Sequence, residues 1–232
     1  MKELSRRTLR FDPAQTLTGG SSALSARSRP ADPAAQRTDA PVRRTDAQRN
    51  RERLIDVATA AFTAGTGKVA LESIARDAGV GIGTLYRHFP TREALVEAVY
   101  RSELERLCDR MPGLVAAMPA DQALREWMGR YADFFETKRE MAEALRAVIA
   151  SGAVSAEQTR ARLGDAIQLA LDAGAEAGLL RSDIAATDIS VALAGIMVMA
   201  GSADQREQSD RLLDLLLDGL RPAKGSPNKR DR

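Results

Sequence analysis

Residues 71–95 read LESIARDAGVGIGTLYRHFPTREAL, and this stretch decides the fold. Its first half carries apolar residues at helical spacing: Leu71, Ile74, Ala75 and Ala78. This spacing predicts a short helix with one buried face. Gly79 follows, and glycine tolerates the left-handed conformation that ends helices. A second short helix is predicted over residues 82–88, because Pro90 prevents its continuation.

Two short helices around a glycine turn form a helix-turn-helix, the motif whose second helix lies in the major groove of DNA. Leu85 and Phe89 are expected to face inward, and Thr91 is expected to cap the next helix. A helical hairpin inside some other α-helical protein is the alternative reading. Residue 70 is Ala, so the helix that begins at Leu71 is predicted to lack a side-chain cap.

The pattern Gly-x-x-x-x-Thr-Leu-Tyr-x-His-Phe over residues 79–89, followed by Arg92 and Leu95, resembles the TetR/AcrR family of bacterial transcriptional repressors. The resemblance covers residues 45–100 and is only architectural beyond them. It implies an all-α protein in which a long helix 4 joins an N-terminal helix-turn-helix domain to a helical ligand-binding and dimerisation domain. It further implies a homodimer on a palindromic operator, released by an unidentified small-molecule effector. An activator, or an architectural regulator without a small-molecule ligand, is the alternative.

The resemblance also assigns residues to double-stranded DNA. It implies that Ile82, Gly83 and Thr84 face the bases, while Tyr86, His88 and Arg92 face the phosphate backbone. Arg87 is the one side chain of this helix suited to bidentate base contacts, and its facing stays open. Hydroxyl, imidazole and guanidinium groups are all donors toward phosphate oxygens, so the assignment is chemically reasonable. The alternatives are a core-packing role for Tyr86 and a surface bond to a neighbouring carbonyl for His88.

The charge distribution supports the same division of the chain. Residues 43–92 hold nine Lys/Arg and five Asp/Glu, a balance of +4, whereas residues 111–221 hold 11 and 17, a balance of −6. A basic region suits contact with phosphates, and an acidic one does not. Residues 1–44 are predicted to be a disordered basic extension, in which Arg43 and Arg44 are candidate DNA contacts beside the first helix. The alternative for the extension is a loose tail without a role.

Four domains or segments follow from these patterns. They are a disordered extension at 1–44, the helix-turn-helix domain at 45–92, an effector-binding and dimerisation domain at 93–221, and a disordered basic tail at 222–232. Thr45 or Asp46 is expected to cap helix 1, and helix 4 is expected to run from Thr91 to about Arg110, with a break at Pro112. Five further helices are predicted at about 121–137, 139–150, 155–177, 187–200 and 209–220.

An aromatic stripe in the helix at 121–137 is a candidate effector pocket. Such stripes are usually core, but the resemblance implies that this region lines a ligand site. The candidate pocket residues are Trp127, Met128, Tyr131, Phe134, Phe135 and Met141. The charge of the ligand is left open.

The last two predicted helices are candidates for a dimer interface. The helix at 187–200 is apolar on nearly every side, so it should be buried on two faces. Two copies of both helices would form a four-helix bundle, although burial within one chain is the alternative. The candidate interface residues are Ile196, Met197, Leu212, Leu213, Leu216, Leu217 and Leu220.

Composition argues against other classes. The single histidine lies in the helix-turn-helix, and no catalytic triad, metal cluster or glycine-rich phosphate loop is found, so neither an enzyme nor a cofactor or metal site is expected. The one cysteine, Cys108, excludes a disulfide within the chain; a small buried group is favoured over a redox sensor. The longest apolar run, residues 189–201, is too short to span a bilayer. We therefore expect a cytoplasmic protein that does not enter membranes.

Overall fold

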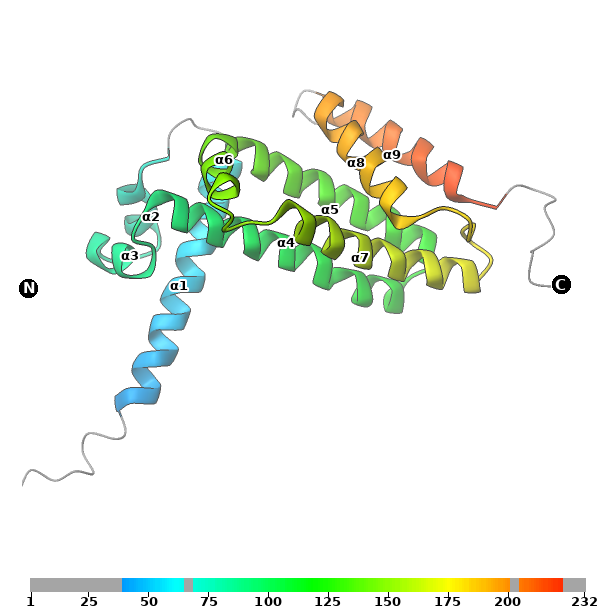
Figure 1. Ribbon diagram of the computed structural model, residues 1–232. Coiled ribbons are helices and arrows are strands. Elements are labelled where there is room, and N and C mark those ends of the chain that lie inside the picture. The colour runs from blue at the N-terminus through cyan, green and yellow to red at the C-terminus, as the bar shows by residue number, and fades with distance from the viewer. Residues whose placement is uncertain (1–38, 65–68, 201–204, 223–232) are drawn as a thin grey trace, which may run out of the picture. The chain divides into compact units, whose positions relative to one another are not determined.

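The computed structural model describes residues 39–64, 69–200 and 205–222, and it describes side chains from residue 45 onward. Every regular element in these ranges is a helix, which confirms the all-α prediction (Figure 1). The helices are α1 Asp39–Thr63, α2 Leu71–Asp77, α3 Ile82–His88, α4 Arg92–Ala117, α5 Ala120–Glu140, α6 Ala142–Ala150, α7 Ala156–Glu176, α8 Ala186–Ala200 and α9 Arg206–Leu220. None of the described helices is both long and apolar enough to cross a membrane.

The first three helices form a small head around apolar side chains of α1, α2 and α3. Leu54, Ile74 and Leu85 are fully buried in it. Gly79 adopts φ +67° between α2 and α3, a conformation that favours glycine, and the Val80 amide donates to the Ala75 carbonyl at 2.9 Å. The predicted bounds of α3 and the glycine turn are confirmed. Ala70 makes no side-chain cap, as its sequence predicts.

Helix α1 begins earlier than predicted. Its first residue is Asp39, so the prediction that Thr45 or Asp46 caps it is wrong, because both lie inside the helix. Pro41 is tolerated there, since amide groups of the first turn have no partner within a helix. The disorder predicted for residues 1–44 is wrong at residues 39–44, which lie in α1. Residues 1–38 of the predicted extension and residues 223–232 of the predicted tail at 222–232 lie outside the described residues.

Helix α4 runs through the position where the sequence predicts a break. It continues to Ala117 with Pro112 in its interior, so the predicted end near Arg110 is wrong. A proline inside a helix costs about 3 kcal/mol through its lost hydrogen bond. Buried Leu107 and Met111 on the inner face of the same turns offset that cost by packing against the body. The N-terminal prediction is confirmed, since Thr91 accepts a hydrogen bond from the Ala94 amide at 3.1 Å.

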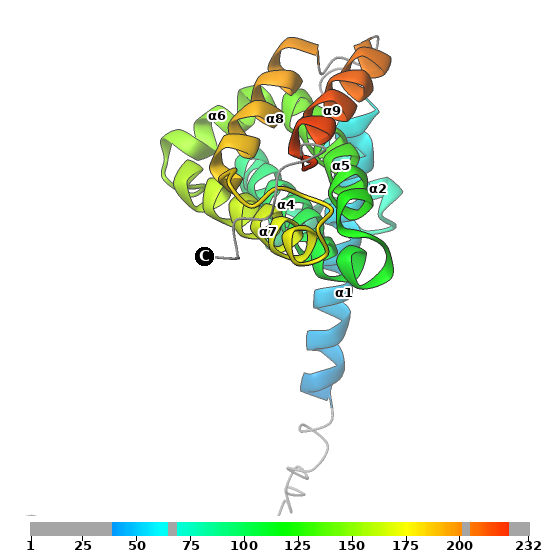
Figure 2. The same ribbon diagram turned by 90° about the vertical axis from the view of Figure 1, so that its right-hand side faces the viewer.

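The remaining helices form the body. Helix α4 packs against α5, α6 and α7; α7 also packs against α8, and α9 packs against α5 and α8. Helices α8 and α9 therefore lie side by side, as both views show (Figures 1 and 2). Helix α5 begins and ends slightly outside its predicted range, so that Arg139 belongs to α5 rather than to α6. Ser155 caps α7 by accepting from the Gln158 amide at 3.2 Å.

Candidate nucleic-acid interface

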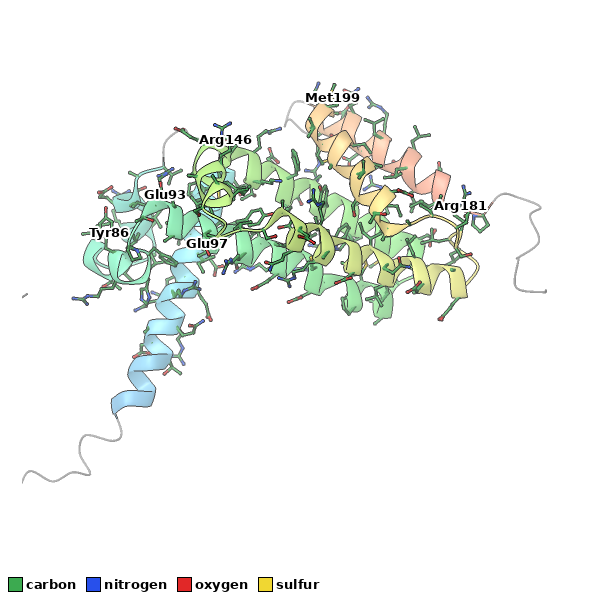
Figure 3. All side chains as sticks on the ribbon, in the orientation of Figure 1. Tyr86, Glu93, Glu97, Arg146, Arg181 and Met199 are labelled. Atoms are coloured by element: carbon green, nitrogen blue, oxygen red, sulfur yellow. The ribbon has the colours of Figure 1, made fainter. Side chains whose placement is uncertain are left out.

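Helix α3 presents one face to the head and the other to solvent. Leu85 and Phe89 are buried in the core of the head, so they fix how the helix lies. On the opposite side, Ile82 is 38% exposed and Tyr86 is 44% exposed, although large hydrophobic and aromatic residues usually prefer burial. Figure 3 shows Tyr86 on the outer side of α3. This position does not fit the core-packing alternative for Tyr86.

The predicted DNA-contacting residues of α3 differ in exposure. Gly83 and Arg87 are exposed like Tyr86, whereas Thr84 and His88 are half-buried. A side chain added at Gly81 or Gly83 would meet nothing within 4 Å, so the start of α3 is thin and open. A bulky duplex can therefore approach the helix backbone closely.

Arg92 differs from its predicted role. Its guanidinium donates to the Val69 carbonyl at 2.5 Å and lies 5.6 Å from the centre of the Phe62 ring. The structure therefore directs this cation against the head itself, where it fastens the segment before α2 to α1 and α4. The prediction that Arg92 faces the phosphate backbone is not met in this arrangement, because sequence spacing does not show a carbonyl partner 23 residues away.

Basic residues of α1 contact the helix-turn-helix, which the sequence does not predict. The Arg51 guanidinium lies 5.3 Å from the centre of the Phe89 ring, and Arg53 donates to the Ala78 carbonyl at 3.4 Å. Both contacts join α1 to the ends of α2 and α3, and so hold the outer face of α3 in place. Arg43 and Arg44 belong to α1, but their side chains lie outside the described part of the chain.

The candidate effector residues fall mainly in the core of the body. Trp127 and Met128 are fully buried, and the Trp127 indole donates to the Leu107 carbonyl at 2.9 Å. Tyr131 stacks on Trp127 with ring centres 5.9 Å apart, and burial raises the pKa of Tyr131 to about 12. These contacts correspond to the core alternative that the sequence leaves open.

Phe134 and Met141 are also buried, but each lines a cleft, and Phe135 is the one candidate that is only half-buried. Phe134 lines a cleft between α1, α4 and α5, and Met141 lines another between α1, α4 and α6. Phe135 is half-buried, and the Lys138 ammonium lies 5.6 Å from the centre of its ring. Burial lowers the pKa of Lys138.

Four of the seven candidate interface residues are buried within the chain. Met197, Leu213, Leu217 and Leu220 belong to its own core, whereas Ile196, Leu212 and Leu216 are half-buried. As lining for an interface, the four buried residues are a wrong assignment, because the leucine-rich faces of α8 and α9 pack on α5, on α7 and on each other. The outer surface carries different apolar side chains: Val191 is 72% exposed, Val198 69%, Met199 77% and Leu215 67%.

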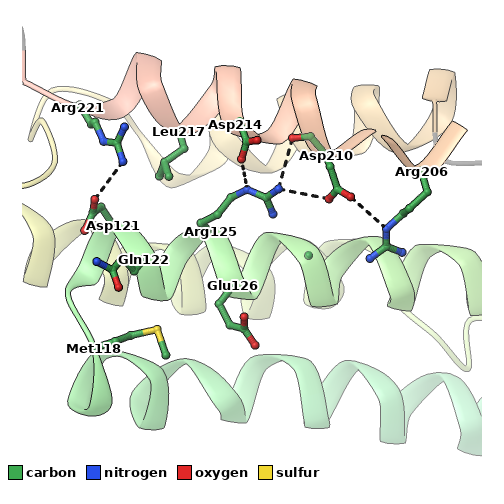
Figure 4. A pocket seen from close by; sticks show the side chains of 11 residues that line it. Met118, Asp121, Gln122, Arg125, Glu126, Arg206, Asp210, Asp214, Leu217 and Arg221 are labelled. Carbon is green, nitrogen blue, oxygen red and sulfur yellow. Dashed lines mark hydrogen bonds and ion pairs between the residues drawn. The ribbon is translucent and has the colours of Figure 1, made fainter. Parts of the chain in front are cut away.

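A cleft of about 570 Å³ between α5 and α9 is bridged by ion pairs (Figure 4). Arg125 binds Asp214 at 2.5 Å and Asp210 at 3.3 Å, and Arg221 binds Asp121 at 3.3 Å. The cations and carboxylates that face each other here neutralise one another. These ion pairs fix α9 against α5. The charge pattern of a single helix does not predict them, because their partners lie on different helices.

Comparisons with known proteins agree with this architecture. Residues 54–99 match the family described as bacterial regulatory proteins, tetR family, and residues 119–222 match the domain described as transcriptional regulator SbtR-like, C-terminal domain. An HTH-type transcriptional regulator of Staphylococcus aureus is 36% identical over 63 residues, which are 27% of this chain and 34% of that relative. The chain thus matches about a third of the length of this curated relative.

Two solved structures match over nearly their whole length. A TetR transcriptional regulator from Streptomyces coelicolor is 51% identical, with a TM-score of 0.68 over 75% of this chain and 99% of that chain. A TetR transcription regulatory protein from Mycobacterium vanbaalenii is 32% identical, with a TM-score of 0.60 over 77% and 99% of the two chains. With its exposed recognition helix and its helical body, the chain belongs to the TetR family of DNA-binding transcriptional regulators.

Proposed function

We propose that this regulator is a cytoplasmic repressor that binds a palindromic operator as a homodimer and is released by a small-molecule effector. The observation that supports it most directly is the outer face of α3, where Ile82 and Tyr86 are exposed around an open glycine backbone. A recognition helix of this kind lies in the major groove and contacts bases with its first residues.

The proposed contacts divide along α3. Ile82, Gly83 and Thr84 lie at the helix N-terminus and read the bases by apolar contact and shape. Tyr86 and His88 donate to phosphate oxygens, which position the protein without reading sequence. Arg87 supplies a cation on the same exposed face, and Arg43 and Arg44 of α1 are proposed as further phosphate contacts. Because bidentate base readers are scarce on this helix, much of the specificity depends on the shape of the DNA.

A test of this interface uses the open space at Gly83. Gly83→Ala should leave the fold intact or improve it slightly, since alanine favours helices and the added methyl group meets no protein atom within 4 Å. The same methyl group lies between the helix and the bases, so operator binding should weaken about tenfold or more. Gly164→Ala is the matched control, because Gly164 is a helical glycine of the body whose added Cβ also meets nothing.

The operator for this test comes from selection of fragments from a random DNA pool by the purified protein. Binding of labelled fragments is then measured for the chain and for both variants. Unchanged binding by Gly83→Ala would contradict the placement of α3 in the groove, and failure to select any duplex at low salt would refute the proposed function.

Dimerisation is proposed through the outer surfaces of α8 and α9. Val191, Val198 and Met199 recur at helical spacing on α8, and Leu215 continues the apolar surface on α9. Two copies of this surface related by a two-fold axis would bury it and would set two recognition helices on two half-sites.

Leu215→Glu places a charge in the proposed interface without disturbing the core, because Leu215 is 67% exposed. It should yield monomers in light scattering, whereas Leu169→Glu, at an exposed leucine of α7, should leave the dimer intact. A dimer that survives the change at Leu215 would exclude this surface.

The proposed release mechanism is a population shift through α4. This helix begins beside the recognition helix and runs along the body, where it packs on α5, α6 and α7. An effector that binds one arrangement of the body more tightly therefore changes the position of the head by linkage. Operator affinity falls when the two heads no longer match successive half-sites.

A further inference from the structure

A cleft of about 370 Å³ lies where α1 of the head meets α4 and α5 of the body. Its volume is at the small end of the range for ligand pockets. Leu107 and Phe134 form apolar walls, and hydroxyl groups come from Thr59, Thr63 and Thr137. Three arginines and three acidic residues complete the lining. The cleft is therefore a place where one small molecule could touch the head and the body at once.

Two buried polar atoms of the lining have no hydrogen-bond partner in the described part of the chain. They are Thr59 Oγ1 on α1 and Arg130 Nε on α5. Leaving a buried donor unsatisfied costs about 1–3 kcal/mol, so native proteins rarely keep such groups without a partner. Thr63 and Thr137, in contrast, are bonded to each other at 3.0 Å. The unsatisfied atoms indicate a polar ligand that lies between α1 and α5.

Of the three arginines in the cleft, Arg106 and Arg130 form ion pairs, Arg130 with Glu126 at 2.6 Å, and only the third has no acidic partner in the described part of the chain. Each acidic residue of the lining has a basic partner: Glu103 pairs with Arg106 at 3.1 Å, Asp133 with Arg206 at 2.7 Å and Glu136 with Arg139 at 3.9 Å. Arg106 also binds Asp56 of α1.

Arg110 of α4, by contrast, makes no hydrogen bond or ion pair with any described residue. Its free guanidinium and the unsatisfied Arg130 Nε–H are both donors without acceptor capacity. Together they favour an anion in the cleft.

We propose that this cleft binds a small carboxylate with a short apolar body. The carboxylate would accept from Arg110 and from Arg130 Nε, and Thr59 Oγ1 would complete its hydrogen bonds. The apolar body would lie on Leu107 and Phe134, which are buried at the cleft wall. Guanidinium–carboxylate bonds are among the stronger hydrogen bonds in proteins, so the site would discriminate an acid from its neutral amide.

The regulatory meaning of this site rests on the proposed function, whereas its occupancy does not. A carboxylate that bonds α1, α4 and α5 together stabilises one arrangement of head and body. Its binding free energy is then coupled to that of operator DNA, with equal size in both directions.

The experiment titrates the full chain with butanoate, hexanoate and octanoate in the absence of DNA. The single tryptophan reports occupancy, because the Trp127 indole bonds the carbonyl of Leu107, which lines the cleft. At least one of the acids should change its fluorescence with saturation in the millimolar range or below, and the matching amide should bind about tenfold more weakly or not at all.

Variants then locate the site. Arg110→Ala and Thr59→Val should each weaken binding, Arg110→Ala by about tenfold, because a charge-assisted hydrogen bond is lost. Arg146→Ala is the control, since Arg146 is an exposed arginine of α6 that does not line this cleft. Calorimetry with the strongest acid confirms stoichiometry.

The proposal fails if none of the three acids binds, if acid and amide bind alike, or if Arg110→Ala binds as well as Arg146→Ala. None of these results would contradict operator binding, which is measured separately with the selected DNA. If the chain binds the acid but selects no double-stranded DNA, the proposed function is refuted, whereas the proposed carboxylate site is supported.

Discussion

The hydroxyl oxygens of Thr63 and Thr137 lie 3.0 Å apart, although the two residues are 74 positions apart in the chain. Thr63 ends α1, and Thr137 lies in the last turns of α5. Each hydroxyl also lies near a carbonyl of its own helix, that of Thr59 at 2.9 Å and that of Asp133 at 3.2 Å. Whichever hydroxyl donates to the other, the second proton therefore finds an acceptor, and the pair connects head to body without an unsatisfied group.

A double-mutant cycle on this pair measures the connection. Thr63→Val and Thr137→Val should each lower the free energy of unfolding by roughly 0.5–1.5 kcal/mol, because each removes one partner of a hydrogen bond at nearly constant volume. The double variant should lose clearly less than the sum of the two, since both remove the same bond. Urea denaturation of the three variants gives the coupling energy. Strict additivity would mean that the two hydroxyls do not interact.

Arg92 should act on stability more than on DNA contact. Arg92→Ala removes a charged donor from the Val69 carbonyl and a cation from the Phe62 ring, so it should lower the free energy of unfolding by about 1–3 kcal/mol. The slope of log affinity for the operator against log salt should stay the same, because that slope counts neutralised phosphates. Arg87→Ala, at an exposed arginine of α3, is the comparison and should flatten the slope by about one unit per site.

The combined readout separates the two roles of Arg92. If Arg92→Ala flattens the slope of log affinity against log salt but leaves the free energy of unfolding unchanged, Arg92 contacts phosphate as the sequence predicts. Thermal unfolding and operator titration at several salt concentrations give both quantities for the same preparations.

The head was predictable because its signals are local. Gly79 ends α2, Pro90 limits α3 and Thr91 caps α4, and each of these residues acts within one helical turn of its own position. Periodicity also places Leu85 inward, and the resemblance places Tyr86 outward. The role of Arg92 was not predictable, since its acceptor is the carbonyl of Val69, and both α2 and α3 lie between these two residues in the sequence.

The body shows where local signals end. Pro112 predicts a helix break, yet α4 continues through it because Leu107 and Met111 are held by other helices. The leucine spacing on α9 predicts an apolar face, but it does not predict whether that face packs against the same chain or against a second copy. Leu213 and Leu217 pack inside, and the exposed Leu215 remains for a partner. Similarly, the stripe around Trp127 fills the core.

Cys108 should be a poor redox sensor. Burial raises the pKa of its thiol to about 11, well above the ordinary value of 9.0. The thiolate is the reactive form, so at pH 8 the folded chain should react with iodoacetamide about a hundredfold more slowly than the urea-unfolded chain. The rate should rise with pH up to the raised pKa. Mass spectrometry of timed samples measures it, and equal rates in the folded and unfolded chains would contradict the raised pKa of the half-buried thiol.

Gly174 is the glycine of α7 that packing demands. A Cβ at this position would lie 2.5 Å from Leu180 Cδ1 and 2.8 Å from Leu180 Cβ, and the Leu180 amide donates to the Gly174 carbonyl at 3.1 Å. Gly174→Ala should therefore lower the free energy of unfolding by about 1–3 kcal/mol, since the close backbone approach leaves Leu180 little room to move. Gly164→Ala on the same helix meets nothing within 4 Å and should raise stability by up to about 1 kcal/mol.

The opposite signs at the two glycines distinguish packing from helix propensity, because both changes give α7 the same gain in propensity. Adding Leu180→Ala to Gly174→Ala should relieve part of the clash, since Leu180 Cγ and Cδ1 are then removed and only the Cβ contact at 2.8 Å remains. Leu180→Ala alone should itself be destabilising, because Leu180 is buried. The test is therefore the coupling energy from urea denaturation. A coupling energy near zero would show that the turn after α7 moves away from the new methyl group without cost.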